Sequence, residues 1–545
     1  MNFNDINITE EKNGDKTYNI LMIVADQLSY QLLKADDYCL PAREKLMKKG
    51  ITFENHYISS AVCTPSRGTI FTGQHPQVSG IFDHMILGYV PSLDPDKPSI
   101  GTTMKKLGYN TAYYGKFELD SNILYPDKGK SYRDALKKYG FDEFQIEGDR
   151  WGSAHEGYVT DICTTAEGIR WLRKNNVNSA EKNKPWFMTL SFLNPHDIMY
   201  ADCNKPGESV QVNKSGEKLA PPPKSEHYSK KWNFDLWESL NQDMDAQNLP
   251  SYYKEYFKIW GDSMGYIPKD NTDMWKTYYN YYLNLVKEND NNLNKILNEL
   301  DNLDLWKNTI VVFTSDHGEL AGAHGGLRSK GPFSYEQNSH VPFIAVHPDA
   351  EGGRVSKELT CHIDILPTLA GLTDRNKETI DELNSSLPGN DFSAIIKDQV
   401  KSENLKKREG VLFNYVSPHS IDYDYFNWVF KYPLKGEFPP DFSVRKPNLS
   451  YRGFMSFVYD GRYKFARFYS PDNFNTPATF EEIFQNNDIE LYDLKNDPDE
   501  MNNLAAESEK YRDLIMSNNT LMNKLIAEEV GKNDGSYLPH ELWGS

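Results

Sequence analysis

Two pairs of polar residues follow two of the most apolar runs of the sequence. Asp26 and Gln27 come directly after "ILMIVA", and Asp316 and His317 come directly after "IVVFTS". Two carboxylates, an amide oxygen and an imidazole form a mostly hard donor set, which suits a divalent cation. Either aspartate taken alone is better explained as the N-cap of the helix after its strand. The two pairs together, with the cysteine described next, favour a metal site.

A cysteine in the run "SSAVCTPSRGTIFTGQHP" is the third feature that could carry chemistry. Cys63 is one of five cysteines, and the others are Cys39, Cys163, Cys203 and Cys361. Because they are odd in number, widely scattered and free of any Cys-x-x-Cys pair, they predict neither a disulfide framework nor a structural zinc site. What Cys63 does therefore depends on which residues lie near its sulfur.

These residues need a scaffold that brings distant strand ends together. Nearly continuous apolar runs predict buried strands at 18–26, 110–115, 186–193, 309–316 and 341–348. Helical patterns lie between them, at "PAREKLMKKG", which Gly50 would end, and over 158–174 and 273–300. This alternation predicts an α/β fold with a mostly parallel sheet flanked by helices, and a site at the carboxyl ends of the strands.

Two regions depart from this alternation. The turn-rich and aromatic segment from about 195 to 270 is interpreted as an insertion at the carboxyl edge of the sheet. It could line a substrate site, or it could be a surface excursion or a subunit contact. From about residue 404, short strands and a helix over 507–530 predict a smaller α+β domain with an antiparallel sheet. The predicted domains are therefore residues 1–403 and 404–545.

Charge and composition limit the classes of partner. The 545 residues include 60 Lys and Arg against 78 Asp and Glu, which gives a net charge of −18. A balance this acidic argues against nucleic acid or an anionic membrane as the main partner, although not against a small anionic substrate. The first 19 residues lack the basic and apolar regions of an export signal, and "ILMIVA" is too short to span a bilayer. We therefore expect a cytoplasmic protein, and an oligomer is possible.

The run "CTPSRGTIFTG" resembles the signature of the sulfatases, in which Cys-x-Pro-Ser-Arg precedes a Thr-Gly pair. Further segments resemble parts of that family in the family's order, namely "GYNTAYYGK", "LSFLNPHD", "TSDHGELAGAHG", "HIDILPTLAGL" and "LYDLKNDPDEMNNLA". The resemblance covers residues 19 to 505. It implies an alkaline-phosphatase-like α/β domain with a smaller C-terminal domain, and the hydrolysis of a small organic sulfate ester.

The same resemblance implies the chemistry of Cys63. A separate maturation enzyme would oxidise this cysteine to formylglycine, whose hydrated form carries two hydroxyls. One hydroxyl would attack sulfur while bound to the metal. The other would expel sulfate as the aldehyde reforms. The resemblance assigns Asp26, Gln27, Asp316 and His317, together with modified Cys63, as ligands of one divalent cation. Calcium is the expected ion, with magnesium or manganese as alternatives.

Other residues receive catalytic roles from the resemblance alone. Asp316 would also accept the proton of the nucleophile, and Arg67 would orient the diol. Lys116 and Lys330 would bind the sulfate oxygens, and His196 would protonate the leaving oxygen. Without the ordered family segments, His196 would be read as a turn residue and Lys330 as a surface lysine. Arg67 could simply pair with a carboxylate.

Two departures from the common sulfatase pattern bear on the mechanism. Many sulfatases carry Asp-Asp and Asp-Asn where this chain has Asp-Gln and Asp-His, a combination that resembles choline-sulfatase-like enzymes and phosphonate monoester hydrolases. Glu118, in "GKFELD", stands where the family has a histidine that contacts the formylglycine. Glu118 could act as a base, or it could point away while His84 or another group replaces that histidine.

Several alternatives stay open from the sequence. The same site could hydrolyse a phosphonate monoester or phosphodiester, and a non-catalytic binding protein could share the scaffold. A two-zinc phosphatase is disfavoured because the chain has no Asp-x-x-x-His spacing. Aromatic residues in 230–280 and in "DYDYFNW" could line a pocket for a sugar, aryl or choline-like group, or could simply pack in the core.

Overall fold

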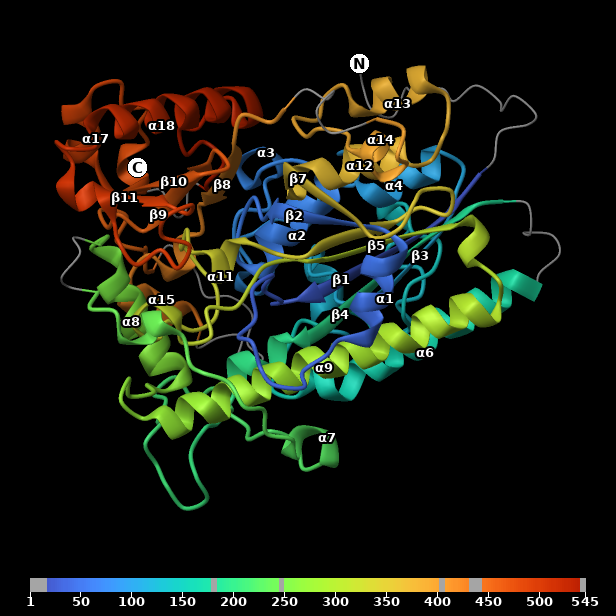
Figure 1. Ribbon diagram of the computed structural model, residues 1–545, viewed down its shortest axis with the longest axis horizontal. Coiled ribbons are helices and arrows are strands. Elements are labelled where there is room, and N and C mark those ends of the chain that lie inside the picture. Colours follow the sequence, from blue (N-terminus) through green and yellow to red (C-terminus); the bar gives the residue numbers. More distant parts are fainter. Residues whose placement is uncertain (1–16, 178–183, 245–248, 401–406, 431–443, 540–545) are drawn as a thin grey trace.

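Strand β1 (Asn19–Asp26) lies inside a seven-stranded sheet of the computed structural model, which describes residues 17–177, 184–244, 249–400, 407–430 and 444–539 (Figure 1). In spatial order the strands are β3 (Asn110–Gly115), β4 (Trp186–Pro195), β1, β5 (Thr309–Ser315), β6 (Phe343–Val346), β2 (Ile51–Tyr57) and β7 (Arg354–Cys361). All of them run parallel except β6, which is antiparallel to both of its neighbours. The predicted α/β class with a mostly parallel sheet is confirmed.

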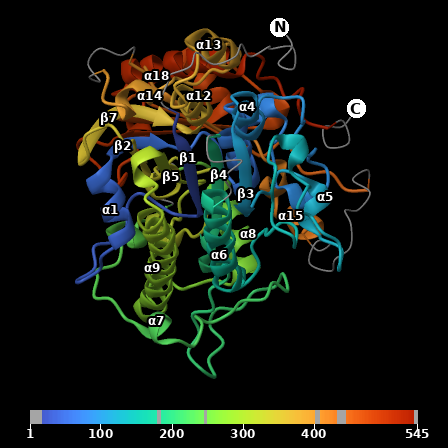
Figure 2. The same cartoon turned by 90° about the vertical axis from the view of Figure 1, so that its right-hand side faces the viewer.

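Helices cover both faces of this sheet, as Figures 1 and 2 show. On one face lie α1 (Pro41–Lys49), α6 (Glu156–Val177) and α9 (Thr272–Asn302), and on the other lie α2 (Cys63–Thr72), α4 (Ile100–Lys106) and α12 (Ile365–Gly371). The side chains of β1 alternate between the two cores, with Leu21, Ile23 and Ala25 on the first face and Ile20, Met22 and Val24 on the second. A strand covered on both faces is apolar at every position, which is why its sequence shows no alternation.

A second sheet follows the first in sequence. Its four antiparallel strands are ordered β11 (Asn487–Asp493), β10 (Tyr463–Tyr469), β9 (Phe454–Tyr459) and β8 (Val411–Tyr415), with α17 (Phe480–Asn486) and α18 (Arg512–Leu525) packed against it. The antiparallel sheet after residue 404 was predicted. The helix starts at Arg512 rather than near 507, and it continues as a π-helical turn over Ile526–Val530. The predicted boundary at 403/404 falls in 401–406, outside the described residues.

The two sheets share buried contacts. Glu490 of β11 accepts hydrogen bonds from the hydroxyls of Tyr253, in α8 (Tyr252–Met264), and Ser334. Lys464 of β10 is buried and pairs with Glu336 and Glu500. The smaller sheet is therefore bonded to helix α8 and to the segment between β5 and β6.

Two strands of the large sheet were not predicted. Strand β2 carries Glu54, Asn55 and His56 among its apolar residues, and β7 is an edge strand with five of its eight positions partly exposed or exposed. The predicted end of the first helix at Gly50 is confirmed, but this glycine has an extended backbone. A Cβ there would lie 2.1 Å from the carbonyl oxygen of Ala345, so the close approach of β6 requires glycine.

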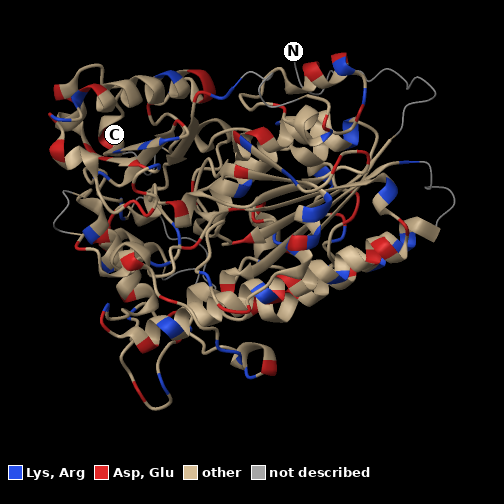
Figure 3. Cartoon of the chain, viewed as in Figure 1, with Lys and Arg blue, Asp and Glu red and all other residues tan. Residues whose placement is uncertain are grey.

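Acidic and basic residues are interspersed along the outer helices rather than gathered by sign in this view (Figure 3). In the described part of the chain, no helix combines the length and the apolar composition needed to cross a membrane.

Candidate active site

Four neighbouring strands bring polar side chains to one edge of the large sheet. The spatial order β3-β4-β1-β5 places Lys116, His196, Asp26 and Asp316 next to one another, because each stands at the carboxyl end of its strand or directly after it. Carboxyl ends of parallel strands meet at one edge, which is where α/β proteins form their sites. All four side chains are buried.

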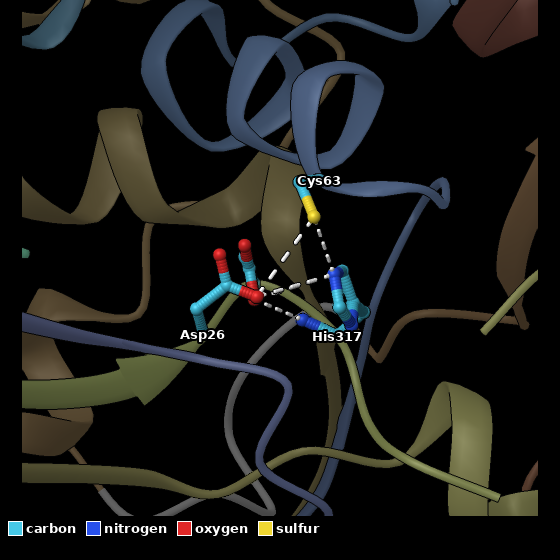
Figure 4. Close-up of side chains that lie close together, drawn as sticks. Asp26, Cys63 and His317 are labelled. Atoms are coloured by element: carbon cyan, nitrogen blue, oxygen red, sulfur yellow. Dashed lines mark hydrogen bonds and ion pairs between the residues drawn. The ribbon is translucent and has the colours of Figure 1, made fainter. Parts of the chain in front are cut away.

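Cys63 lies at the same edge but comes from a helix, since it is the first residue of α2 (Figure 4). Its sulfur lies 3.1 Å from Nε2 of His317 and 3.8 Å from Oδ1 of Asp26. One ligand atom from each of Asp26, Cys63, Asp316 and His317 falls within 4.8 Å of the other three. Residues that are 254 positions apart in the chain therefore share one buried centre.

The hydrogen bonding of His317 prepares it to bind a metal. Its Nδ1 lies 3.0 Å from the carbonyl oxygen of Gly318 and donates a proton to it. In the neutral ring the unprotonated nitrogen is therefore Nε2, which faces Asp26 at 3.6 Å and Asp316 at 3.7 Å. Two carboxylates and an imidazole held in this way fit a divalent cation.

Gln27 lies beside this group with a left-handed backbone, at φ 71°. Its amide nitrogen donates to Glu319 and its amide oxygen accepts from Nζ of Lys330 at 2.5 Å. The backbone N–H of Gln27 donates to Oδ1 of Asp316 at 3.1 Å, so Gln27 adjoins the group of metal-ligand atoms. Lys330 therefore stands where it can bind either Gln27 or a substrate.

Arg67 forms ion pairs with both carboxylates, those of Asp26 and Asp316. It lies one helical turn after Cys63, and its Nη2 is 3.2 Å from Asp26 and 3.0 Å from Asp316. Its Nη1 donates to the carbonyl oxygen of Lys116 and to the hydroxyl of Ser191. The guanidinium thus fixes the spacing of the two aspartates, whereas the resemblance assigned it to the diol.

The concentration of charge shifts the acidities of these groups. Burial raises the pKa of Asp26, but the charges of Lys116 and Arg67 outweigh burial and hold it below its usual range. Burial and the charge of Asp26 raise the pKa of Asp316 to about 6. Burial also opposes ionisation of Cys63, yet Lys116 and Lys330 hold the pKa of its thiol well below its usual range.

Glu118 points into the site. It has a left-handed backbone at φ 54°, held by hydrogen bonds from the amides of Phe117 and Glu118 to Asp149. Its carboxylate lies 3.1 Å from Nζ of Lys116 and 3.3 Å from Nδ1 of His84. Burial lowers the pKa of His84, but Glu118 and a hydrogen bond to Cys63 raise it, with a net increase. The sequence left open whether Glu118 points into the site or away from it, and in the structure its carboxylate points into the site.

His196 forms part of the floor of a pocket above Cys63. Its ring abuts Gly152, where a Cβ would come within 2.7 Å of the imidazole. Burial and the charge of Lys330 lower the pKa of His196 to about 4. The imidazole is therefore neutral at pH 7 and can offer an N–H to a bound oxygen.

The pocket contains about 760 Å³ of empty space, including its open mouth. His84, His196 and Lys330 line its inner end. Its walls come from the 195–270 insertion, through Tyr200, Glu217, Trp260 and neighbours, and from Trp151, Phe426 and Phe430. The insertion therefore lines the candidate site, and part of "DYDYFNW" does so as well.

Sequence reasoning missed several of these residues. Glu319 orients Gln27 and accepts a hydrogen bond from Tyr278, and its place in "DHGE" directly after the second metal pair was an available signal. Glu217 lies in turn-rich sequence and had no such signal. Trp260 of α8 belongs to the aromatic residues of 230–280, which the sequence offered as a possible pocket lining.

Comparisons with known proteins agree with this geometry. The sequence model of the Sulfatase family matches residues 18–375. The protein called "uncharacterized sulfatase YidJ" of Escherichia coli is 26% identical over 481 residues, covering 85% of this chain and 78% of its own. N-acetylglucosamine-6-O-sulfatase of Bacteroides thetaiotaomicron is 23% identical, covering 92% and 84%. The solved phosphonate monoester hydrolase of Agrobacterium radiobacter shares the fold, with a TM-score of 0.62, 19% identity and coverage of 94% and 96%.

Proposed function

Since the chain belongs to the sulfatase family and is a sulfuric ester hydrolase, we propose that it cleaves its ester with a formylglycine made from Cys63, beside one divalent cation. The observation that carries this proposal is the meeting of Cys63 with Asp26, Asp316 and His317 within 4.8 Å. The side chain of residue 63 is thereby placed where it could bind the same cation as the two carboxylates and the imidazole.

Asp26, Gln27, Asp316, His317 and residue 63 would hold the cation, with calcium favoured by the oxygen donors and magnesium or manganese as alternatives. When bound, the cation supplies positive charge that favours ionisation of the nucleophile and stabilises the sulfuryl oxygens. Lys116 and Lys330 would bind the same oxygens from the pocket side, replacing their present partners.

The chain's own groups account for the proton transfers. One hydroxyl of hydrated residue 63 attacks sulfur and passes its proton to Asp316, while the sulfur–oxygen bond to the alcohol breaks. Binding of the anionic ester offsets the charge of Lys330, so His196 can take up a proton from water and give it to the departing alcohol oxygen. The second hydroxyl then loses its proton, the carbonyl reforms, and the bond from carbon to the sulfate oxygen breaks. Water restores the diol.

We assign the base for the second step to His84, with Glu118 as its partner. His84 contacts Cys63, and its Nδ1 faces the Glu118 carboxylate at 3.3 Å. Glu118 is itself paired with Lys116 at 3.1 Å, which reduces its repulsion of a bound sulfate. The pair replaces the histidine that the common family pattern places at position 118.

A phosphonate monoester or phosphodiester is the second candidate substrate. Gln27 supplies a neutral ligand where a carboxylate is common, so the cation keeps more positive charge for a different anion. Comparing kcat/KM on 4-nitrophenyl sulfate and on 4-nitrophenyl phenylphosphonate separates the two. A higher value on the phosphonate would make it the main activity.

The mass of the peptide that carries residue 63 tests the proposal directly. We expect protein produced together with a formylglycine-generating enzyme to show a loss of about 18 Da at this residue. Hydrolysis of 4-nitrophenyl sulfate should rise in proportion to the converted fraction. Cys63→Ala should lose activity by about a thousandfold or more. Complete conversion without turnover of either ester, or equal turnover by Cys63→Ala, would refute it.

A further inference from the structure

The pocket above Cys63 has two chemically different ends. The inner end carries His84, His196 and Lys330, beside the buried Lys116. The outer part is lined by the aromatic rings of Trp151, Tyr200, Trp260, Phe426 and Phe430, together with His419, which pairs with Asp83. The rings of Phe426 and Phe430 stack on each other with centroids 4.4 Å apart. An ester bound with its sulfate at the inner end would therefore place its alcohol part among aromatic faces.

One carboxylate stands among these rings. Glu217 lines the pocket, and within the described part of the chain no Lys, Arg or His pairs with its side chain. Burial raises the pKa of this carboxyl to about 7. Tyr200 lines the same pocket, and the centroid of its ring lies 6.0 Å from that of His196 at the inner end.

The position of Glu217 is fixed by its loop. The backbone N–H of Glu217 donates to the hydroxyl of Ser215 at 3.2 Å, and its carbonyl accepts from the amide of Asn213 at 2.6 Å. Ser215 in turn donates from its hydroxyl to the carbonyl of Ser263 in α8 at 2.9 Å. The loop that carries Glu217 is therefore hydrogen-bonded to α8, the helix that also carries Trp260.

From this arrangement we infer that the pocket selects sulfate esters whose alcohol part carries a positive charge, held by Glu217 and the surrounding aromatic faces. Aromatic faces and a carboxylate attract a cation together, and the attraction is stronger where water is excluded. This inference rests on the proposed function, because it takes the inner end as the place of the sulfate. It also separates the substrates that the aromatic residues alone left open, since a neutral sugar or aryl group gains nothing from the charge of Glu217.

The test compares two esters of the same shape. 2-(Trimethylammonio)ethyl sulfate carries the positive charge, and 3,3-dimethylbutyl sulfate has carbon in place of nitrogen. With the formylglycine form of the enzyme, we expect kcat/KM to be at least about tenfold higher for the charged ester. In Glu217→Gln this ratio should fall towards one. Glu208→Gln, which removes the same charge from an exposed site in the same insertion, should keep the ratio of the wild type.

Binding keeps the inference separate from the proposed chemistry. Calorimetric titration of the unconverted Cys63 protein with both esters needs no turnover, and the charged ester should bind about tenfold more tightly. Selective binding, together with no hydrolysis of either ester by the formylglycine form, would overturn the proposed function and leave this inference standing. A ratio near one in the wild type, or a ratio that survives Glu217→Gln, would overturn the inference, and a neutral sugar or aryl ester would then be the better substrate class.

Discussion

Oε1 of Glu118 lies 3.3 Å from Nδ1 of His84, and the two residues come from separate loops that meet beside Cys63. The carboxylate faces Nδ1 of the imidazole, which leaves Nε2 to act on residue 63. A carboxylate–histidine pair of this kind orients the ring and stabilises its charged form.

If the pair acts as one base, its two substitutions should not be additive. We expect His84→Asn to lower kcat about 100-fold and Glu118→Gln about tenfold. The double variant should be no slower than His84→Asn alone, because Glu118 acts only through the imidazole that the first substitution has already removed. Steady-state kinetics of the four proteins measure this, with the exposed Glu351→Gln as the control. Full multiplication of the two effects would show that the residues act independently.

Gly152 sets the position of His196. In Gly152→Ala the new Cβ would lie 2.7 Å from the imidazole, which must then move away from the leaving oxygen. We expect kcat to fall about tenfold or more for an alkyl sulfate, and less for 4-nitrophenyl sulfate, whose leaving group needs little protonation. Gly207→Ala is the matched control, because Gly207 also has a left-handed φ but no atom within 4 Å of its Cβ position. Equal losses in both variants would point to backbone strain instead.

A cation bound by Asp316 and its neighbours should stabilise the fold. At a concentration 100 times its dissociation constant, the ion should add about 3 kcal/mol to the free energy of unfolding of protein first treated with a chelator. Thermal unfolding with added calcium, magnesium or manganese measures this without reference to activity. Asp316→Asn should abolish the gain, and the exposed Asp304→Asn should retain it. A full gain in Asp316→Asn would place the cation elsewhere.

Glu490, which is buried between the two sheets, should make the free energy of unfolding depend on pH. Burial raises its pKa from 4.5 to about 7 in the folded protein. The folded state therefore holds more protons than the unfolded state over this range, so stability should fall as pH rises from about 4.5 to 7. One such carboxyl contributes about 3 kcal/mol over that window.

Urea unfolding at pH 5 and pH 8 measures this contribution. In Glu490→Gln the difference between the two pH values should shrink by about that amount, because the amide keeps its hydrogen bonds and does not titrate. The exposed Glu509→Gln should leave the difference unchanged. An unchanged difference in Glu490→Gln would mean that Glu490 is charged in the folded protein.

The strand ends could be predicted because strands buried on both faces are mostly apolar, so Asp26 at the end of β1 and Asp316 directly after β5 stand out. Strands β2 and β7 lack that uniformity, and their pairing depends on residues 300 positions away, as between Asn55 and Leu359. Local pattern carries no information on such pairing. The family resemblance is confirmed by the match over residues 18–375.

The pocket wall could not be predicted for a related reason. In the insertion, chain path is set by side chains that bond to distant backbone, as when the amide of Gln211 donates to the carbonyls of Ala201 and Met264. Such hydrogen bonds produce no periodic pattern of apolar residues in the sequence. The location of Glu217 beside Tyr200 therefore follows from the fold alone.

The complete burial of Cys63 also restricts when the residue can be converted. Another enzyme cannot reach a sulfur enclosed by a helix start, two aspartates and a histidine. If Cys63 is converted as proposed, conversion would therefore precede folding, on the nascent or unfolded chain, and folding would then enclose the product. Protein that folds first with its thiol intact would be permanently inert, so the yield of active molecules would reflect a race between the maturation enzyme and folding.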